Sequence, residues 1–155
     1  MSKYLIIGNS AAAIGAISGI RQVDTVGEIT VVSKEPYRAY SRPALSHYLC
    51  GEVSDENMYY CKEEFYSRNN VKLRLGKKAV KISPEEKKVW LDGGETLAYT
   101  KLLLASGGSP IRPKIKGDDK GGIYPFVEWD DVKTLNERLP HAKDVVVLGG
   151  GLIGL

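Results

Sequence analysis

The residues with the clearest chemical potential form a glycine-containing turn near the start of the chain. The turn follows an apolar, strand-like run and consists of Gly8, Asn9, Ser10, Ala11, Ala12 and Ala13. It fits a loose GxGxxG/A pattern in which Ser10 replaces the second glycine. A first glycine permits a tight turn, a small second residue lets backbone N–H groups approach a pyrophosphate, and a small third residue lets the helix pack on the strand. The turn therefore predicts a phosphate-binding site at a helix N-terminus, with an ordinary small-residue helix start as the alternative.

A second glycine turn stands at the other end of the sequence. The apolar run VVVL, residues 145–148, leads into Gly149, Gly151 and Gly154, which fit the strict GxGxxG pattern. The run predicts a buried strand, and the glycines predict a second pyrophosphate-binding turn. The helix that should follow is not in the sequence, so we expect the sequence to be part of a longer chain.

A carboxylate at the end of the second strand would complete a nucleotide site. In folds with this kind of turn, an acidic residue about 20 positions further along accepts hydrogen bonds from the adenosine ribose. Lys34 stands at the first position to consider, and Glu35 stands one residue later. We take Glu35 as the ribose candidate, with a surface carboxylate at a strand end as the alternative.

The elements that must position these residues alternate between strands and helices. Hydrophobic patterns predict strands at 4–7, 29–32, 71–75 and 101–105, a hairpin of 79–82 and 88–91, and helices at 11–20, 55–69 and 129–139. Three consecutive leucines, residues 102–104, predict that their strand is buried on both faces. A polar stretch at 107–122 links this strand to the acidic helix at 129–139. The alternation predicts an α/β fold.

Composition favours a globular domain. Of the 155 residues, 43% are apolar and 26% are charged, and no apolar run approaches the roughly 20 residues of a membrane span. The net charge of +3 arises from 22 basic and 19 acidic side chains mixed along the chain, which favours neither a nucleic-acid nor a membrane partner. The start MSKYLIIGNS lacks the longer apolar core of a signal peptide, so we expect a cytoplasmic protein. Cys50 and Cys61 lack zinc-ligand spacing and are expected to be free thiols.

Three further segments, together with the first turn, carry a resemblance to a known family. Tyr40-Ser41-Arg42-Pro43-Ala44-Leu45-Ser46 follows the second strand, YTKLLLASGGSP runs from Tyr99 to Pro110, and GKKAVKI begins the hairpin. With these segments the sequence resembles the FAD-binding half of the pyridine nucleotide-dependent flavoprotein oxidoreductases. It is most similar to the branch that contains the NADH-dependent nitrite reductase flavin domain, rubredoxin and ferredoxin reductases, and apoptosis-inducing factor. The resemblance covers the whole sequence, including the second glycine turn.

The resemblance implies cofactor contacts beyond the first turn. It places Arg42 and Pro43 along the FAD, with the guanidinium near the pyrophosphate and the flavin, where a fixed fork of donors suits phosphate oxygens. It implies a main-chain contact to adenine near Val80, with an ordinary core position as the alternative. The branch often has a lysine near the flavin edge where this sequence has His47, with a partly exposed helix position as the alternative. The remaining implied contacts are Ala105, Ser106 and Gly107 for FAD, and Gly149, Gly151 and Gly154 for NAD(P)H.

The resemblance also implies a domain organisation. It implies a Rossmann-like FAD-binding domain, with a parallel central sheet and a β-hairpin or meander insertion, that is incomplete in this sequence. Residues 1–110 would form the N-terminal part of that domain, residues 111–143 a linker and connecting helix, and residues 144–155 the first strand and glycine turn of an NAD(P)-binding domain. In the family, part of the FAD sheet comes from later sequence, so we expect this piece to self-associate or to retain FAD weakly.

The activity that the resemblance implies is hydride transfer from NAD(P)H to FAD, followed by electron transfer to an acceptor. Acceptors in the branch include rubredoxin, ferredoxin, a nitrite reductase module and oxygen. Relatives with a redox-active cysteine carry it where this sequence has Pro43, and Cys50 lies further along, so no catalytic side chain is assigned. A flavin-binding scaffold similar to apoptosis-inducing factor and an inactive fragment are the alternatives, and a homodimer is compatible with each.

Overall fold

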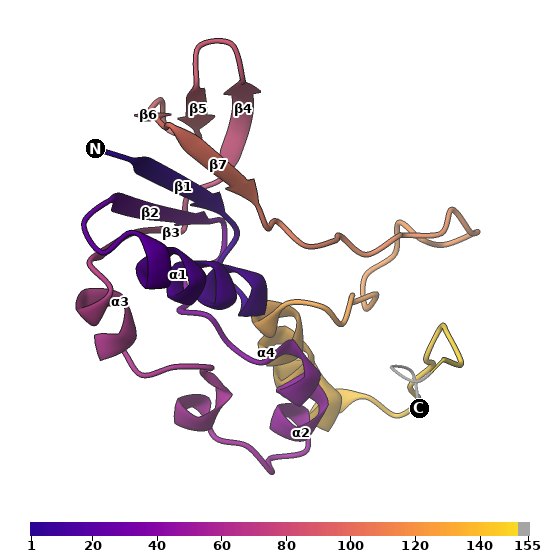
Figure 1. The fold of residues 1–155 in the computed structure, drawn as a ribbon. Coiled ribbons are helices and arrows are strands. Elements are labelled where there is room, and N and C mark those ends of the chain that lie inside the picture. Colours follow the sequence, from indigo (N-terminus) through magenta and orange to yellow (C-terminus); the bar gives the residue numbers. More distant parts are fainter. Residues whose placement is uncertain (152–155) are drawn as a thin grey trace.

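Four parallel strands form the central sheet of the computed structural model, which describes residues 1–151 (Figure 1). The strands are β1 (Lys3–Ile7), β2 (Glu28–Ser33), β3 (Val71–Leu75) and β7 (Lys101–Leu104), in the order β3-β2-β1-β7. The strand β1 pairs with β2 on one side and with β7 on the other. Because the strands are parallel, their carboxyl ends lie at the same edge of the sheet.

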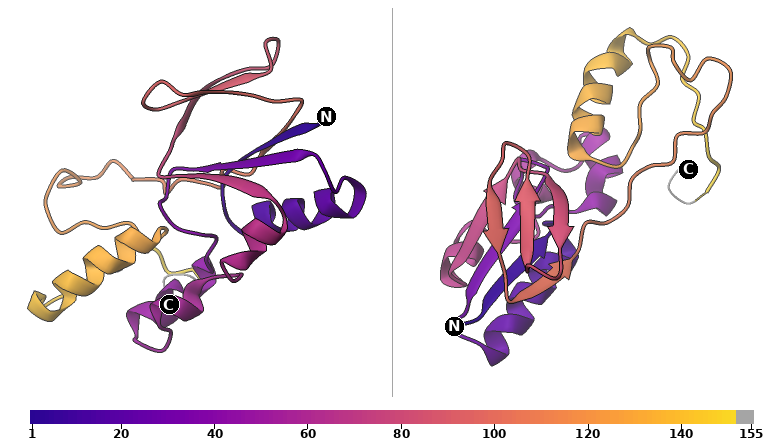
Figure 2. Two further views of the ribbon diagram at one scale, coloured as in Figure 1. Left: turned by 90° about the vertical axis from the view of Figure 1, so that its left-hand side faces the viewer. Right: turned by 90° about the horizontal axis from the view of Figure 1, so that it is seen from above.

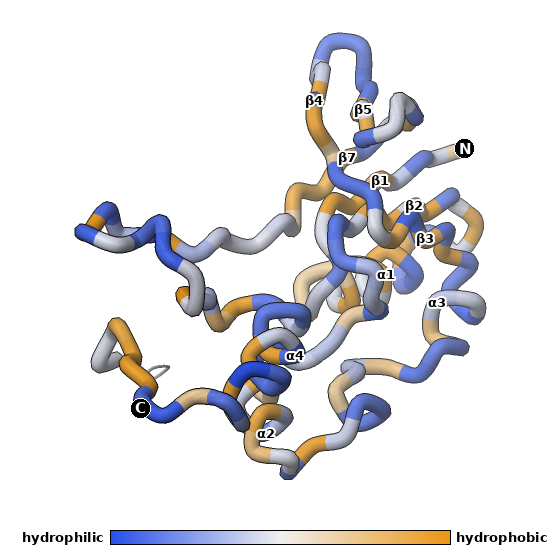
Figure 3. The backbone as a smooth tube through the Cα atoms, turned by 180° about the vertical axis from the view of Figure 1, so that it is seen from behind, coloured by the Kyte–Doolittle hydropathy of each residue, from blue (hydrophilic) through white to orange (hydrophobic). Residues whose placement is uncertain are grey.

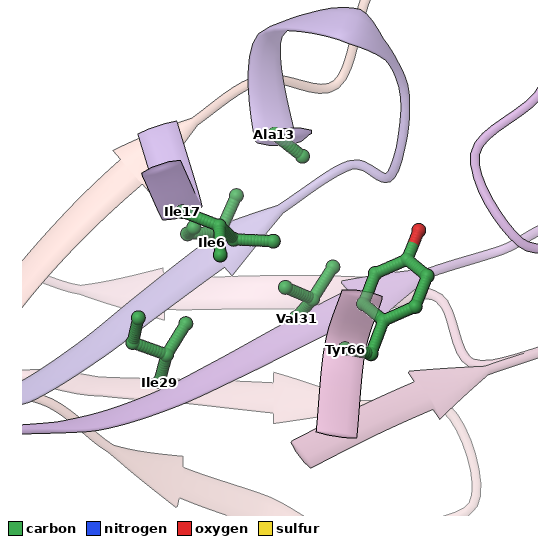
Figure 4. Close-up of a cluster of buried hydrophobic side chains, with 6 residues drawn as sticks. All are labelled: Ile6, Ala13, Ile17, Ile29, Val31 and Tyr66. Atoms are coloured by element: carbon green, nitrogen blue, oxygen red, sulfur yellow. The ribbon is translucent and has the colours of Figure 1, made fainter. Parts of the chain in front are cut away.

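Two helices cover one face of this sheet. The helix α1 (Ala11–Val23) connects β1 to β2, and α3 (Glu64–Arg68) precedes β3. Side chains alternate between the two faces of a strand, and Ile6 and Val31 point toward the helices, where they pack with the fully buried Ile17. Figure 4 shows this cluster, which consists of Ile6, Ala13, Ile17, Ile29, Val31 and Tyr66.

A small antiparallel sheet covers the opposite face. It consists of β4 (Ala79–Ser83), β5 (Lys88–Leu91) and β6 (Thr96–Ala98), in that order. The sequence predicts the hairpin but not β6, because three residues are too short for a period-two pattern to stand out. The buried side chains of this sheet pack against Leu5, Ile7 and Val32. The domain therefore has a helical layer, a parallel sheet and an antiparallel sheet (Figure 2).

A separate cluster joins the chain after β2 to a helix near the end of the described residues. The segments that meet are η1 (Arg42–Ala44), α2 (Leu45–Leu49), η2 (Asp55–Met58) and α4 (Trp129–Arg138), and η3 (Leu139–His141) follows α4 directly. Figure 1 shows α4 beside α2. The indole of Trp129 is fully buried, and four tyrosine rings lie with centroids 5.0 to 5.5 Å from it. We call this group the Trp129 cluster; it includes Tyr37, Tyr40, Tyr48, Tyr59, Leu45, Met58 and Val132.

The predicted α/β fold is confirmed, and one predicted helix is wrong in its extent. The segment 55–69 forms η2 and α3 rather than one helix. Between them, Tyr59 pairs in antiparallel fashion with Tyr40, and the N–H of Tyr60 donates to the carbonyl of Ala39 at 2.9 Å. These long-range backbone bonds replace the bonds that a continuous helix would make.

The strand β7 is less buried than its three leucines predict. Leu103 and Leu104 are 40% and 61% exposed. Among the described strands, β7 pairs with β1 alone, so it lies at the edge of the sheet and has one uncovered side.

The predicted strand at 145–148 does not form in the structure. No strand within residues 1–151 pairs with this run, and Val146 is 90% exposed. Figure 3 shows the run lying away from both sheets. A strand needs a hydrogen-bonded neighbour, and none of the described residues provides one here.

The polar stretch between β7 and α4 contains no helix or strand, and it carries the chain from the sheet to the Trp129 cluster (Figure 2). Within the described part of the chain, no helix has the length and apolar character needed to cross a membrane.

Asp24 stabilises the turn between α1 and β2. Its carboxylate accepts hydrogen bonds from the N–H groups of Gly27 and Val26, at 2.7 and 3.1 Å, and from the Tyr4 hydroxyl at 3.0 Å. The bond from Gly27 contributes most to lowering the pKa of Asp24, followed by those from Val26 and Tyr4. A carboxylate whose pKa is lowered by folding contributes stability above its unfolded pKa of about 3.9, and this stability is lost as the pH falls through the folded value.

We predict that Asp24→Asn lowers the thermal unfolding midpoint at pH 7. Below about pH 4 the midpoint of the variant should fall less steeply than that of wild type. The asparagine amide carries no charge for the turn to stabilise. Lowering the pH therefore removes less stability from the variant than from wild type. Thermal melts from pH 7 to pH 3 measure both effects, with Asp119→Asn in the exposed loop as the control. Equal acid-dependent losses in wild type and Asp24→Asn would contradict this role.

Candidate functional site

A cavity of about 620 Å³ opens at the carboxyl ends of β1, β2 and β7. This volume lies within the range of small-molecule sites. The strand order reverses between β1 and β7, which is the place where open parallel sheets bind ligands. The walls come from the glycine turn, the end of β2, Arg42, the chain before β4, the segment after β7, and residues 127 and 128.

Gly8 brings two parts of the cavity wall into contact. Its φ of +110° is unfavourable for residues with a side chain. A Cβ atom at this position would lie 2.5 Å from the carbonyl carbon of Ala105 and closer still to its oxygen. The N–H of Ala105 donates to Ile7 at 2.7 Å, so the chain after β7 is held directly against the turn. Only glycine permits this approach.

The start of α1 presents backbone donors without side-chain partners. Ser10 is the N-cap residue, but its side chain makes no capping hydrogen bond, and the first turn contains no acidic residue. The first N–H groups of a helix have no partner within the helix. They carry a partial positive charge that favours an anion. The start of α1 therefore presents the backbone donors on which the predicted phosphate site depends.

Asn9 has a positioning role that its place in the pattern does not reveal. Its side-chain oxygen accepts a hydrogen bond from the Tyr66 hydroxyl at 3.0 Å, and its side-chain nitrogen donates to the carbonyl of Tyr37 at 3.3 Å. The Tyr66 hydroxyl also accepts the N–H of Ala39 at 3.1 Å. Burial raises the pKa of Tyr66, which keeps the hydroxyl protonated for its bond to Asn9. Asn9 therefore ties the glycine turn to the chain that follows β2.

Glu35 is partly buried and already has two partners. Its side chain is 11% exposed and forms an ion pair with Arg42. The Tyr40 hydroxyl donates to its other oxygen. Burial, followed by this bond to Glu35, raises the pKa of Tyr40 well above its usual value. Glu35 is thus a carboxylate of fixed orientation at the cavity wall.

Positive charge exceeds negative charge around the cavity. The lining contains four basic residues, Lys34, Lys77, Lys78 and Arg42, and two acidic residues, Glu35 and Glu128. Lys34 forms an ion pair with Glu128. The N–H of Lys77 donates to the carbonyl of Ser33 at 2.9 Å, which holds the two neighbouring lysines against the end of β2. A negatively charged ligand suits this excess of positive charge.

The cavity collects many of the predicted site residues. Those that line it are Gly8, Asn9, Ser10, Lys34, Glu35, Arg42, Ala105, Ser106 and Gly107. The side chain of Ala13 instead packs in the core beneath α1, and Ala11 and Ala12 are exposed at the start of that helix. These three alanines can contribute backbone groups alone.

Other predicted residues lie outside the cavity wall. Pro43 is exposed in η1. Val80 is 58% exposed, and its neighbour Ala79 lines the cavity instead, because successive residues of β4 point to opposite faces. His47 is exposed in α2, where its Nδ1 lies 2.6 Å from Glu52. Gly149 and Gly151 are exposed away from the cavity, and Gly154 lies outside the described residues.

Several wall residues escape sequence reasoning. Lys77 and Lys78 directly precede Ala79 in the GKKAVKI segment, so that segment was the signal that could have found them. Val127 and Glu128 have no such signal, because they reach the cavity through the packing of α4 against the Trp129 cluster.

The fold and this cavity define a nucleotide-binding domain of the Rossmann type. The family model described as pyridine nucleotide-disulphide oxidoreductase matches residues 2–155. The chain therefore belongs to the pyridine nucleotide-disulphide oxidoreductase family, which confirms the resemblance seen in the sequence.

Curated relatives agree with this membership. The chain is 36% identical over 152 residues to a rubredoxin-NAD(+) reductase of Pseudomonas putida, covering 97% of this chain and 40% of the relative. It is 35% identical over 154 residues to the epsilon subunit of the NADH-dependent phenylglyoxylate dehydrogenase of Aromatoleum evansii, covering 99% and 37% of the two chains. The chain thus spans about two-fifths of the length of these relatives.

Solved structures show the same fold. The NADH:rubredoxin oxidoreductase of Clostridium acetobutylicum superposes with a TM-score of 0.85 at 27% identity, over 99% of this chain and 39% of that one. The water-forming NADH oxidase of Lactobacillus brevis superposes with a TM-score of 0.90 at 27% identity, over 99% of this chain and 36% of that one.

We predict that Gly8→Ala destabilises the chain by at least about 2 kcal/mol, since it combines a strained backbone with overpacking against Ala105. Chemical denaturation measures the change. Gly15→Ala is the matched control, because nothing lies within 4 Å of its added Cβ and the residue is inside α1. It should stabilise the chain by up to about 1 kcal/mol. Equal effects of the two substitutions would refute the close-approach explanation.

Proposed function

We propose that this chain forms the FAD-binding part of an NAD(P)H-dependent oxidoreductase. The family consists of FAD-dependent proteins that use NAD(P)H. The observation that carries the proposal is the meeting of the Gly8 turn, Glu35, Arg42 and the Ser106 segment in one cavity. Residues 1–110 belong to the FAD domain, residues 111–143 connect it onward, and residues 144–155 begin the NAD(P) domain.

The residues of the cavity fit the chemistry of FAD. The free N–H groups at the start of α1 and the excess of positive charge suit a pyrophosphate. The Glu35 carboxylate is placed at the end of β2, where an acceptor for ribose hydroxyls belongs. Gly8 lets the chain after β7 lie directly against the turn, and the wall continues along Ser106 and Gly107 beyond it. These residues would hold the adenosine diphosphate half and the start of the flavin half.

FAD held by these residues would supply the redox chemistry, which is hydride acceptance from a nicotinamide and electron transfer to an acceptor. The side chains of this chain bind and orient. Arg42 donates to both Glu35 and the Val127 carbonyl, which fixes its guanidinium at the cavity wall. The described cavity wall contains neither Cys50 nor Cys61, and burial raises the pKa of Cys61, which disfavours its thiolate. These observations support a reaction without a redox-active cysteine.

An electron-acceptor protein is the proposed partner. Relatives of this chain include a rubredoxin-NAD(+) reductase and the large subunit of a nitrite reductase. The first name includes a small redox protein, rubredoxin, and the second names a nitrite reductase. We therefore propose a small redox protein or a reductase module as the acceptor.

The first test is the visible absorption spectrum of the purified intact protein, before and after incubation with FAD and desalting. A retained flavin spectrum that NADH bleaches under anaerobic conditions is the expected result. Retention of FAD without bleaching would support the cofactor and reject the oxidoreductase. A protein that stays colourless would reject both.

Glu35→Ala should weaken FAD binding by about tenfold or more, because a hydrogen bond to a charged group contributes roughly 1.5–3 kcal/mol. Flavin fluorescence titration of the protein freed of its flavin measures the affinity. Glu137→Ala, at an exposed position of α4, is the control for loss of a carboxylate elsewhere. Unchanged FAD affinity in Glu35→Ala would remove Glu35 from the site.

A further inference from the structure

The hydroxyl of Tyr40 joins two parts of the chain that are far apart in sequence. It donates to Glu35 at the end of β2, and it accepts the backbone N–H of Trp129 at 3.0 Å. The tyrosine ring is 3% exposed within the Trp129 cluster. A hydroxyl has one proton to donate, and the N–H of Trp129 can only donate. The Tyr40 hydroxyl therefore donates its one proton in the hydrogen bond to Glu35.

Arg42 makes a second bridge between the same two parts. Its Nη2 pairs with the other oxygen of Glu35, and its Nη1 donates to the Val127 carbonyl at 2.5 Å. Lys34 adds an ion pair to Glu128. Residues 127–129, which we call the strap, are thus tied to the end of β2 by three side chains. Two of these ties meet at Glu35.

These ties fix the orientation of Glu35 without exhausting its capacity. A carboxylate offers about four lone-pair sites, and Tyr40 and Arg42 together take two of them. The remaining sites are available to a ligand in the cavity that Glu35 lines. A preorganised acceptor binds more tightly than one that must be ordered on binding.

We propose that Tyr40 is a positioning residue that holds Glu35 for the ribose hydroxyls of the bound nucleotide, and so couples the ribose site to the strap. This inference rests on the proposed function, since it assumes that Glu35 faces the ribose. Coupling between two sites is reciprocal. Ribose binding at Glu35 therefore stabilises the strap as much as the strap favours ribose binding.

The test compares ADP with 2′,3′-dideoxy-ADP on the intact protein freed of its flavin. Wild type should prefer ADP by roughly tenfold or more, because hydroxyls that donate to a carboxylate are lost in the dideoxy compound. In Tyr40→Phe, this preference should fall at least threefold while the affinity for 2′,3′-dideoxy-ADP stays the same. A merely structural role would weaken both nucleotides together.

Tyr59→Phe is the matched control. Tyr59 packs against the same indole, with its ring centroid 5.5 Å away, and its hydroxyl makes no hydrogen bond with the described residues. It should keep the full preference for ADP. In a Glu35→Ala background, Tyr40→Phe should have no further effect on the preference, because the group that it positions is gone.

Hydrogen exchange of wild type supplies a measurement that does not depend on the folding of any variant. ADP should slow exchange of the Trp129 amide more than 2′,3′-dideoxy-ADP does at equal saturation. Equal protection by the two compounds, or an ADP preference that survives Tyr40→Phe, would overturn the positioning role alone. A wild-type protein that binds neither FAD nor ADP would overturn the proposed function and this inference with it.

Discussion

The contact between Gly8 and the backbone of Ala105 is the constraint on which the cavity depends. It brings the turn after β1 against the chain that leaves β7, so two strands that are nearly 100 residues apart in sequence deliver their ends to one point. The remaining walls come from the end of β2, Arg42, the chain before β4, and residues 127 and 128. The turn has to be glycine because of the neighbouring backbone and because of its own φ of +110°. Packing and backbone conformation thus impose the same residue at this position.

A second set of contacts gives the cavity its polar groups. The Trp129 cluster is built from apolar and aromatic packing, yet its edge carries the hydroxyl of Tyr40 and the guanidinium of Arg42 to Glu35. Tyr37, whose ring packs on the same indole, donates to Asp130, and this bond contributes most to raising the pKa of Tyr37 to about 12. Hydrophobic burial therefore orients the charged groups, since their positions follow from the rings that pack behind them.

The sequence predicts best what depends on local pattern. Short apolar, β-prone runs identify the strands of the central sheet, and the small residues from Gly8 to Ala13 identify the turn, because each signal lies within a few consecutive residues. Prediction fails where long-range pairing decides. The bridge between Tyr40 and Tyr59 interrupts a segment that looks helical, and the leucines of β7 look buried although their strand lies at an edge. The approach of Val127 and Glu128 to Glu35 is likewise invisible, since it follows from a cluster assembled across some 90 residues.

The surroundings of Trp129 have a spectroscopic consequence. The sequence contains two tryptophans, and Trp129 is the one enclosed by four tyrosine rings, with the ammonium of Lys133 4.4 Å from its ring centroid. Trp90 lies on the small antiparallel sheet, beneath Lys81. A buried indole surrounded by tyrosines collects their excitation energy and emits at short wavelength. The chain therefore carries its own fluorophore next to the cavity, and replacing Trp90 by phenylalanine would leave an emission signal that reports on the surroundings of Trp129.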